Sequence, residues 1–299
     1  MNPVKAFYVL VLFAMTIGFV FTHNYTSAIG SFFAMFLVLL IGIAMEAGGK
    51  GEKENTYNIH PSTSPYNVYY GEELKFTQET ISSCLAKHLP YYNCLGVAEQ
   101  QKFLTRLNRF MKSKTFKIHD SKGFIEMPVL VSAAAIQLSF GFDNYMLPQF
   151  EFIHIYPEEF FRSHHSFDVL AGNVSGQSIN ISWKHFLEGF RIPEDGQNVG
   201  LHEMAHAYYY QNFVCRENTD DHFVSGYPQF DVCANKAFDQ EQSPGNDLYS
   251  DYALKNFQEF WAESIELFFE KPAYLHNSYP DLYLALKSVM RQDPLGNKV

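Results

Sequence analysis

The sequence predicts an α+β domain preceded by an N-terminal transmembrane helical hairpin. Two uncharged apolar runs fill the first 50 residues, several later segments repeat apolar residues at helical spacing, and a few short segments alternate as strands do. Helices mixed with a few strands favour an α+β fold over regularly alternating βαβ units. We therefore expect three parts: two membrane helices within 1–50, a linker at 51–75 and a folded domain at 76–299.

The first part contains apolar segments at about 6–21 and 29–45, separated by T-H-N-Y-T-S-A. Both segments are close to the minimum of about 17 residues for a membrane-spanning helix, and the short break suits a turn between antiparallel spans. Lys5 precedes the first span, and Lys50 and Lys53 follow the second. The positive-inside rule then places both ends in the cytoplasm. We expect anchorage in a bacterial inner membrane, with the folded domain on the cytoplasmic side.

Two other interpretations of this region stay open. The first segment can be a cleaved signal peptide, with Lys5 as its n-region and a small-residue site near Ser27 and Ala28. The second segment would then be a single anchor. Burial of both segments in a protein core is the other interpretation, but neither segment shows a polar stripe.

The linker and the first two helices have clear local signals. Residues 46–70 are rich in Gly, Pro, Ser, Asn and charge, as linkers are. Thr77 is the expected N-cap of a helix that runs to His88, with Pro90 closing it. A second helix is expected over 97–111, and its apolar stripe consists of Phe103, Leu104, Leu107, Phe110 and Met111.

The remaining elements follow without any internal repeat. Apolar runs, alternation and helical spacing predict them in this order: a buried helix over 129–138, strands over 150–156 and 177–182, and helices around 198–212, 255–270 and 281–291.

Charge and cysteine content exclude several classes of protein. The formal net charge is −10, and no basic face is visible, which argues against nucleic acid as a partner. The four cysteines form no C-x-x-C pair and are too few for a disulfide scaffold. Bridges 84–94 and 215–233 are possible only outside the reducing cytosol, so we expect unpaired thiols.

The strongest chemical signal is N-V-G-L-H-E-M-A-H at 198–206. His202 and His206 are four residues apart, so a helix places both imidazoles on one face, where they can bind one zinc ion. Glu203 is turned toward a water molecule beside the metal instead of toward the metal. This is the H-E-x-x-H arrangement of metallopeptidases, in which the metal activates water and the glutamate takes its proton.

A catalytic zinc ion needs a third protein ligand. The extended form H-E-x-x-H-x-x-G-x-x-H is excluded, because Tyr209 and Asn212 occupy its last two positions. Candidate donors follow downstream, and among them Glu259, Glu263 and Glu266 share one face of a strongly aromatic helix. An ordinary exposed acidic face on an amphipathic helix remains the alternative reading of these acids.

Three stretches resemble the Mlc titration factor A family (MtfA), zinc metallopeptidases related in fold to the catalytic domain of anthrax lethal factor. They are N-V-G-L-H-E-M-A-H at 198–206, Y-A-L-K-N-F-Q-E-F-W-A-E-S-I-E-L-F-F-E-K-P at 252–272, and P-D-L-Y-L-A-L-K-S-V-M-R-Q-D-P at 280–294. Weaker similarities occur in the family's order from about residue 85 onward. The resemblance implies a zincin-like domain of the gluzincin type.

Carried over to this sequence, the family pattern implies one zinc ion per chain, bound by His202, His206 and Glu259. It makes Glu203 the general base. The family's tyrosine falls on Tyr252, whose hydroxyl would hydrogen-bond the oxyanion formed during hydrolysis.

The resemblance implies further supporting groups. Glu263 matches an acid that would hydrogen-bond a ligand histidine, whereas Glu266 matches an acid without an assigned role. In zincins a strand above the motif helix pairs with the extended substrate, and 177–182 is the expected strand.

Two functions follow from these expectations. The first is a membrane-anchored zinc peptidase that acts on peptide or protein substrates. The second is a non-catalytic regulator with a structural zinc site that binds a partner protein, as the family's namesake binds a transcriptional repressor. Glu203 and Tyr252 favour the enzyme, because a structural site needs neither a base nor an oxyanion donor. Residues 208–251 do not match the family.

Overall fold

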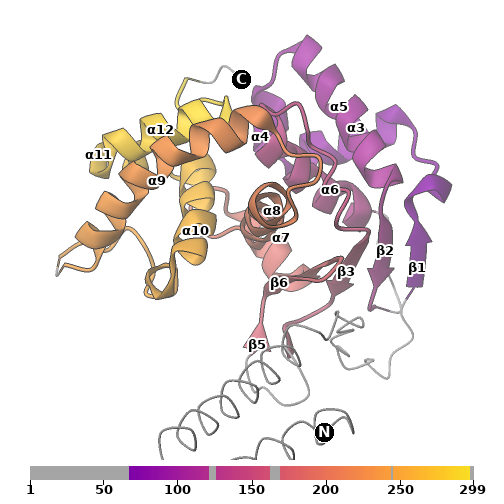
Figure 1. The fold of residues 1–299 in the computed structure, drawn as a ribbon. Coiled ribbons are helices and arrows are strands. Elements are labelled where there is room, and N and C mark those ends of the chain that lie inside the picture. The colour runs from indigo at the N-terminus through magenta and orange to yellow at the C-terminus, as the bar shows by residue number, and fades with distance from the viewer. Residues whose placement is uncertain (1–66, 121–125, 162–168, 244, 297–299) are drawn as a thin grey trace, which may run out of the picture. The chain divides into compact units, whose positions relative to one another are not determined.

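The computed structural model of the chain describes residues 67–120, 126–161, 169–243 and 245–296 (Figure 1). The hairpin expected over 6–21 and 29–45 lies outside these residues and stays a prediction. Among the described residues, no helix is both long and apolar enough to span a membrane. The chain divides into compact units 1–55 and 56–299, and every described element belongs to the second.

Five strands within the described residues form one mixed sheet. Its order is β1 (Asn67–Tyr70), β2 (Thr115–Ile118), β3 (Phe152–Tyr156), β7 (Ser178–Ser182) and β6 (Gly172–Ser175). The three central strands are parallel, and both outer strands are antiparallel to their neighbours. The strand β6 is therefore an edge of the sheet. The short strands β4 (Phe160–Phe161) and β5 (Val169–Leu170) pair separately.

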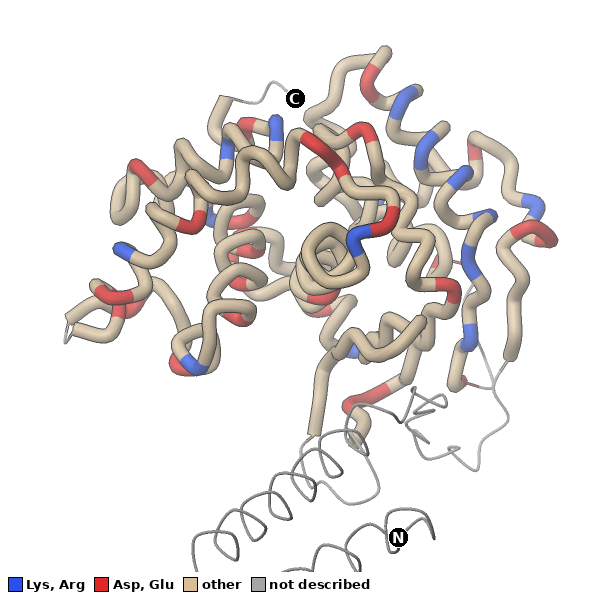
Figure 2. Tube along the Cα trace, viewed as in Figure 1, with Lys and Arg blue, Asp and Glu red and all other residues tan. Residues whose placement is uncertain are grey.

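Helices supply most of the other elements. They are α3 (Gln78–His88), α4 (Pro90–Cys94), α5 (Val97–Lys112), α6 (Glu126–Ser139), α7 (Trp183–Arg191), α8 (Val199–Tyr209), α9 (Asp221–Glu241), α10 (Phe257–Glu270), α11 (Pro272–Ser278) and α12 (Pro280–Met290). Short 3₁₀ turns form η1 (Gly71–Glu73) and η3 (Ala253–Lys255), and a π-helical turn forms η2 (Tyr210–Cys215). Lys and Arg positions recur along α5, and acidic positions recur along α10 (Figure 2).

Sequence signals explain several of these elements directly. Thr77 caps α3, because its hydroxyl accepts a 3.2 Å hydrogen bond from the backbone N–H of Thr80. Helix α3 ends at His88 as expected, and Pro90 then starts α4, where a proline costs no backbone hydrogen bond. Isoleucines alternate on β3 and β7, and the pairs Ile153–Ile179 and Ile155–Ile181 are in register and buried. The expected mixture of helices and a small sheet is therefore confirmed.

One expected segment boundary differs from the structure. The sheet begins at Asn67, within the expected linker at 51–75, because Asn67–Tyr70 pairs with β2. The stretch 208–251, which we could not match to the family from its motifs, contains the long helix α9. This helix packs against α12 and contributes the buried residues Phe223 and Phe230 to the core.

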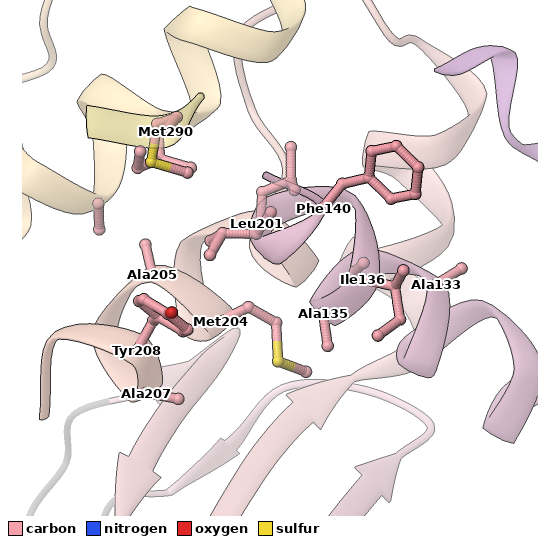
Figure 3. Packing of buried hydrophobic residues seen from close by; sticks show 14 of the residues in the cluster. Ala133, Ala135, Ile136, Phe140, Leu201, Met204, Ala205, Ala207, Tyr208 and Met290 are labelled. Atoms are coloured by element: carbon pink, nitrogen blue, oxygen red, sulfur yellow. The ribbon is translucent and has the colours of Figure 1, made fainter. Parts of the chain in front are cut away.

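Helix α8 lies in the middle of the core. Figure 3 shows its residues Leu201, Met204 and Tyr208 beside α6, a helix that is buried on every side from Met127 to Ser139. The Tyr208 hydroxyl donates a 2.7 Å hydrogen bond to the Asn144 carbonyl. The indole N–H of Trp261 in α10 donates to the Ala205 carbonyl at 3.0 Å. The Trp261 hydrogen bond therefore joins α8 to α10, and the Tyr208 hydrogen bond joins α8 to the loop that follows α6.

Candidate metal centre

Helix α8 begins at a well-formed cap. The Asn198 side chain accepts a 3.0 Å hydrogen bond from the backbone N–H of Leu201, which satisfies one donor of the first turn. From this start the helix places His202 and His206 one turn apart, with the ring centroids separated by 4.7 Å. Glu203 is 4% exposed and points to the same region from the neighbouring position.

Three side-chain atoms from two helices meet at one point. The Nε2 atoms of His202 and His206 are 3.1 Å apart, and Glu259 Oε2 lies 3.1 Å and 3.2 Å from them. Among the described residues, this group has the composition and spacing of a metal site. Ligand atoms 2.0–2.1 Å from a tetrahedral zinc ion would be about 3.3–3.4 Å apart. The arrangement thus fits a tetrahedral ion with three protein ligands.

The charged groups of the triad shift one another's pKa values. Burial lowers the pKa of His202, but the facing carboxylates of Glu266 and Glu259 outweigh burial and raise it well above its usual range. Burial raises the pKa of Glu259, but its hydrogen bonds with His202 and His206 outweigh this effect and lower it well below its usual range. The carboxylate is therefore ionised, as a metal ligand must be.

Glu266, and not Glu263, is the acid that contacts the Nδ1 atom of His202. Glu266 Oε1 lies 2.7 Å from His202 Nδ1, and Glu266 Oε2 accepts a hydrogen bond from the backbone N–H of Asn198. This contact leaves Nε2 of His202 to face the site. The expectation for Glu263 is wrong, because its carboxylate accepts hydrogen bonds from Ser250. The two acids are three residues apart on the same helix, and the sequence pattern alone did not separate them.

Glu203 lies beneath the edge strand of the sheet. A Cβ atom added at Gly172 in β6 would come within 2.4 Å of Glu203 Oε1, so a glycine is required for this close approach. Glu203 Oε2 is buried and has no hydrogen-bond partner in the described part of the chain. Burial raises the pKa of Glu203. A buried carboxylate with one unpaired oxygen is suited to take a proton.

A cleft of about 340 Å³ opens over these groups. The triad, Glu203 and the edge strand β6 line it, together with Tyr252, which is 43% exposed. The ring of Tyr252 lies 6.5 Å from that of His202, measured between centroids. Tyr209, Tyr210 and Val214 continue the lining beyond the triad. Four of the residues expected at the site and the expected tyrosine therefore meet in one cleft.

The expected substrate-pairing strand is also corrected. The segment 177–182 forms β7, which is paired on both sides, with β3 and with β6. Its hydrogen-bonding groups are therefore occupied within the sheet. The strand β6 (Gly172–Ser175) is the edge, and its residues line the cleft.

A mixed α+β domain with two histidines on one helix, a glutamate from a second helix and an acid beside them is of the metallopeptidase class. Comparison with known proteins agrees with this class. The chain belongs to the glucose-regulated metallo-peptidase M90 family, whose model matches residues 72–291. The resemblance to MtfA is thereby confirmed, and the family implies a bound metal ion.

One curated relative is also similar over most of the domain. The uncharacterized protein slr2042 of Synechocystis sp. (strain ATCC 27184 / PCC 6803 / Kazusa) is 26% identical over 240 residues, which cover 71% of this chain and 84% of that protein. Its name states no activity.

Several functional positions were not identified from the sequence. Gly172 lies against Glu203, although the two residues are far apart in the sequence. No sequence pattern around Gly172 predicts this contact. Asn198 carried a readable signal, because Asn directly before a helix is a strong N-cap. Its side chain also donates to Glu270 at 2.8 Å, a contact that depends on how α10 docks.

Proposed function

We propose that this chain is a membrane-anchored, zinc-dependent peptidase of the gluzincin type. The observation that carries the proposal is the convergence of His202, His206, Glu259, Glu203 and Tyr252 on one cleft. A closed structural site would not place an ionisable base and an exposed tyrosine beside its ligands. This composition supports the enzyme over the alternative, a non-catalytic regulator that binds a partner protein.

The residues of the cleft have distinct tasks in peptide hydrolysis. His202, His206 and Glu259 would hold the zinc ion, which when bound polarises a carbonyl and lowers the pKa of water. Glu203 takes a proton from the attacking water as the water oxygen bonds to the carbonyl carbon. Glu203 then gives this proton to the amine nitrogen as the C–N bond breaks. The Tyr252 hydroxyl donates a hydrogen bond to the carbonyl oxygen as negative charge develops there.

The edge strand β6 is the proposed docking site for the substrate. An extended peptide can pair with its outer edge, because β7 occupies only its inner edge. This pairing would carry the peptide past Glu203, since Gly172 lies directly against that side chain. Backbone pairing favours peptide or protein substrates and does not by itself select a sequence.

The location of the enzyme follows from the hairpin expected at 6–21 and 29–45. We propose that it anchors the chain in a bacterial inner membrane, with the peptidase domain on the cytoplasmic side. Three lysines outside the spans support this orientation. An activity reporter fused after Lys53 tests it, and a reporter that works only outside the cytoplasm would contradict the orientation.

The enzymatic proposal is tested on the purified full-length chain in detergent. We expect one zinc ion per chain by elemental analysis and cleavage of peptides from a mixed library. Glu203→Gln should retain zinc and lose turnover, because an amide cannot take the proton. The matched control Glu217→Gln changes an exposed glutamate away from the cleft and should keep activity. Stoichiometric zinc without cleavage of any peptide would favour the regulator.

A further inference from the structure

Helix α10 carries a row of four glutamates, each with a different partner. Glu259, Glu263, Glu266 and Glu270 are spaced so that one face of the helix presents all of them. Glu259 meets the two histidines, Glu266 meets His202, and Glu270 meets the Asn198 side chain. Only Glu263 is bonded to the loop that precedes α10 instead of to α8 or its cap.

The contact between Glu263 and this loop has two hydrogen bonds. The backbone N–H of Ser250 donates to Glu263 Oε1 at 2.7 Å, and the Ser250 hydroxyl donates to Oε2 at 2.5 Å. Both oxygens of the carboxylate are used on one residue. Both hydrogen bonds are short, so Ser250 is held firmly relative to α10.

Ser250 in turn closes the turn that contains Tyr252. The Ser250 hydroxyl oxygen accepts a 3.2 Å hydrogen bond from the backbone N–H of Ala253, and its carbonyl accepts one from Leu254 at 3.3 Å. Tyr252 lies between these residues, at the start of η3. Its position in the cleft therefore depends on where Ser250 is held.

The residue before Ser250 is anchored independently. Tyr249 is buried, its ring stacks on Phe260 with centroids 4.2 Å apart, and its hydroxyl lies 2.8 Å from Ser264 Oγ. These contacts fix the loop on the side of the core. On the side of the cleft, the hydrogen bonds from Ser250 to Glu263 join the turn to α10.

We propose that Glu263 is a positioning residue for Tyr252: through Ser250, it holds the turn that presents the tyrosine hydroxyl to the substrate. This inference rests on the proposed function, in which Tyr252 is a catalytic residue. It replaces the sequence-based expectation that Glu263 supports a metal ligand. Loss of Glu263 should therefore affect catalysis through Tyr252 and leave metal binding unchanged.

A double-mutant cycle on the full-length chain tests the proposal. We expect Tyr252→Phe to lower kcat by about 100-fold, as loss of an oxyanion donor does. Glu263→Ala should lower kcat by about 10-fold with little change in KM, because a small displacement of a catalytic group is costly. In the Tyr252→Phe background, Glu263→Ala should change kcat by less than about 2-fold. Glu263→Gln, which keeps one acceptor for the Ser250 N–H, should restore part of the rate.

Two readouts do not depend on turnover. Zinc affinity, measured by chelator competition, should be unchanged in Glu263→Ala. Hydrogen exchange of the segment 250–255 should become faster in the same variant, because the turn is no longer tied to α10. Ser250→Ala removes the hydroxyl from the other end of the contact and should lower kcat in the same way. The control Tyr249→Phe removes the hydroxyl on the core side, so it should lower Tm and leave kcat within about 2-fold.

The outcomes separate this inference from the proposed function. An active wild type in which Glu263→Ala causes the same fold-loss with and without the Tyr252 hydroxyl would overturn the positioning role. Weakened zinc binding in Glu263→Ala would also overturn it and would return Glu263 to the support of a ligand. A wild type that binds zinc and cleaves no peptide would remove the proposed function and this inference with it.

Discussion

Gly172 of the edge strand β6 lies directly against Glu203 of helix α8. A Cβ at position 172 would be 2.4 Å from Glu203 Oε1 and 2.6 Å from its Cγ, closer than side chains pack. The strand that would receive a substrate and the group that would take the proton are therefore in contact. A shift of β6 toward α8 would therefore displace the Glu203 carboxylate.

Gly172→Ala should lower kcat by about 100-fold, because either β6 or the Glu203 carboxylate must move by several tenths of an ångström or more. Zinc content should stay at one ion per chain, since the three atoms nearest to the added Cβ all belong to Glu203 and not to a proposed ligand. Steady-state kinetics and elemental analysis measure these two quantities. Val169→Ala, at an exposed position in β5, is the control. Unchanged kcat in Gly172→Ala would contradict the placement of Glu203 beneath the strand.

Glu266→Gln should weaken zinc binding by about 10–100-fold, as loss of a carboxylate partner to a ligand histidine does. The 2.7 Å contact from Glu266 to His202 Nδ1 would lose its charge. The NH₂ group of the new glutamine would also face the backbone N–H of Asn198, so two donors would meet without an acceptor. Chelator competition measures the affinity. Glu263→Gln, on the same face of α10, is the matched control, and equal losses in both variants would contradict the assignment.

Glu270 makes stability depend on pH. Burial raises its pKa to about 8, against about 4.3 for an ordinary glutamate, and its Oε2 has no hydrogen-bond partner within the described residues. Between these pH values the folded state keeps a proton that the unfolded chain loses. The folded state then binds more protons, so the free energy of unfolding falls as pH rises from about 5 to about 8.

Glu270→Gln should remove this dependence, because the amide stays neutral and still accepts from Asn198. At pH 8 we expect the variant to be more stable than wild type by about 1–3 kcal/mol, the usual cost of an unsatisfied buried polar group. At pH 5 the two should be nearly equal. Urea unfolding at both values measures the difference, with the exposed Asp239→Asn as control. A variant less stable than wild type at pH 8 would show that the ionised carboxylate is favourable there.

Val214→Lys should change the preference for substrate side chains. His206, Tyr210 and Val214 all line the cleft, so the lining continues from α8 through the π-helical turn η2 as an aromatic and an aliphatic side chain. We expect kcat/KM for peptides with a bulky apolar residue beside the cleaved bond to fall about 10-fold. Peptides with an acidic residue there should be cleaved relatively better.

The control for this experiment is Val232→Lys. Val214 and Val232 are 54% and 53% exposed, but Val232 lies on α9 and does not line the cleft. An identical shift in preference for both variants would point to overall charge instead of to the lining.

The helices of the candidate metal centre were predictable because their signals are local. The spacing of His202 and His206 fixes a shared face on any helix, and the aromatic pattern around Glu259 predicts a buried helix with an acidic stripe. The structure brings these groups together as expected. The family pattern added Tyr252, which spacing alone could not connect to the histidines.

The errors arise where the arrangement of whole elements decides the answer. Glu263 and Glu266 share a face of α10, and only the rotation and tilt of that helix against α8 select which one reaches His202. Likewise, β6 and β7 form a hairpin, and the pairing of β7 with β3 leaves β6 at the edge. Alternation in a single strand carries no information about its neighbours.

The separation of the ligands along the chain has a consequence for biosynthesis. Glu259 follows His202 by 57 positions, with α9 between them. Under the proposed function, a nascent chain that has just exposed its two histidines holds an incomplete zinc site, and it gains the third ligand only after α9 has been translated and α10 has docked. For a peptidase, this order withholds hydrolysis from the ribosome-bound chain until most of the domain has been made.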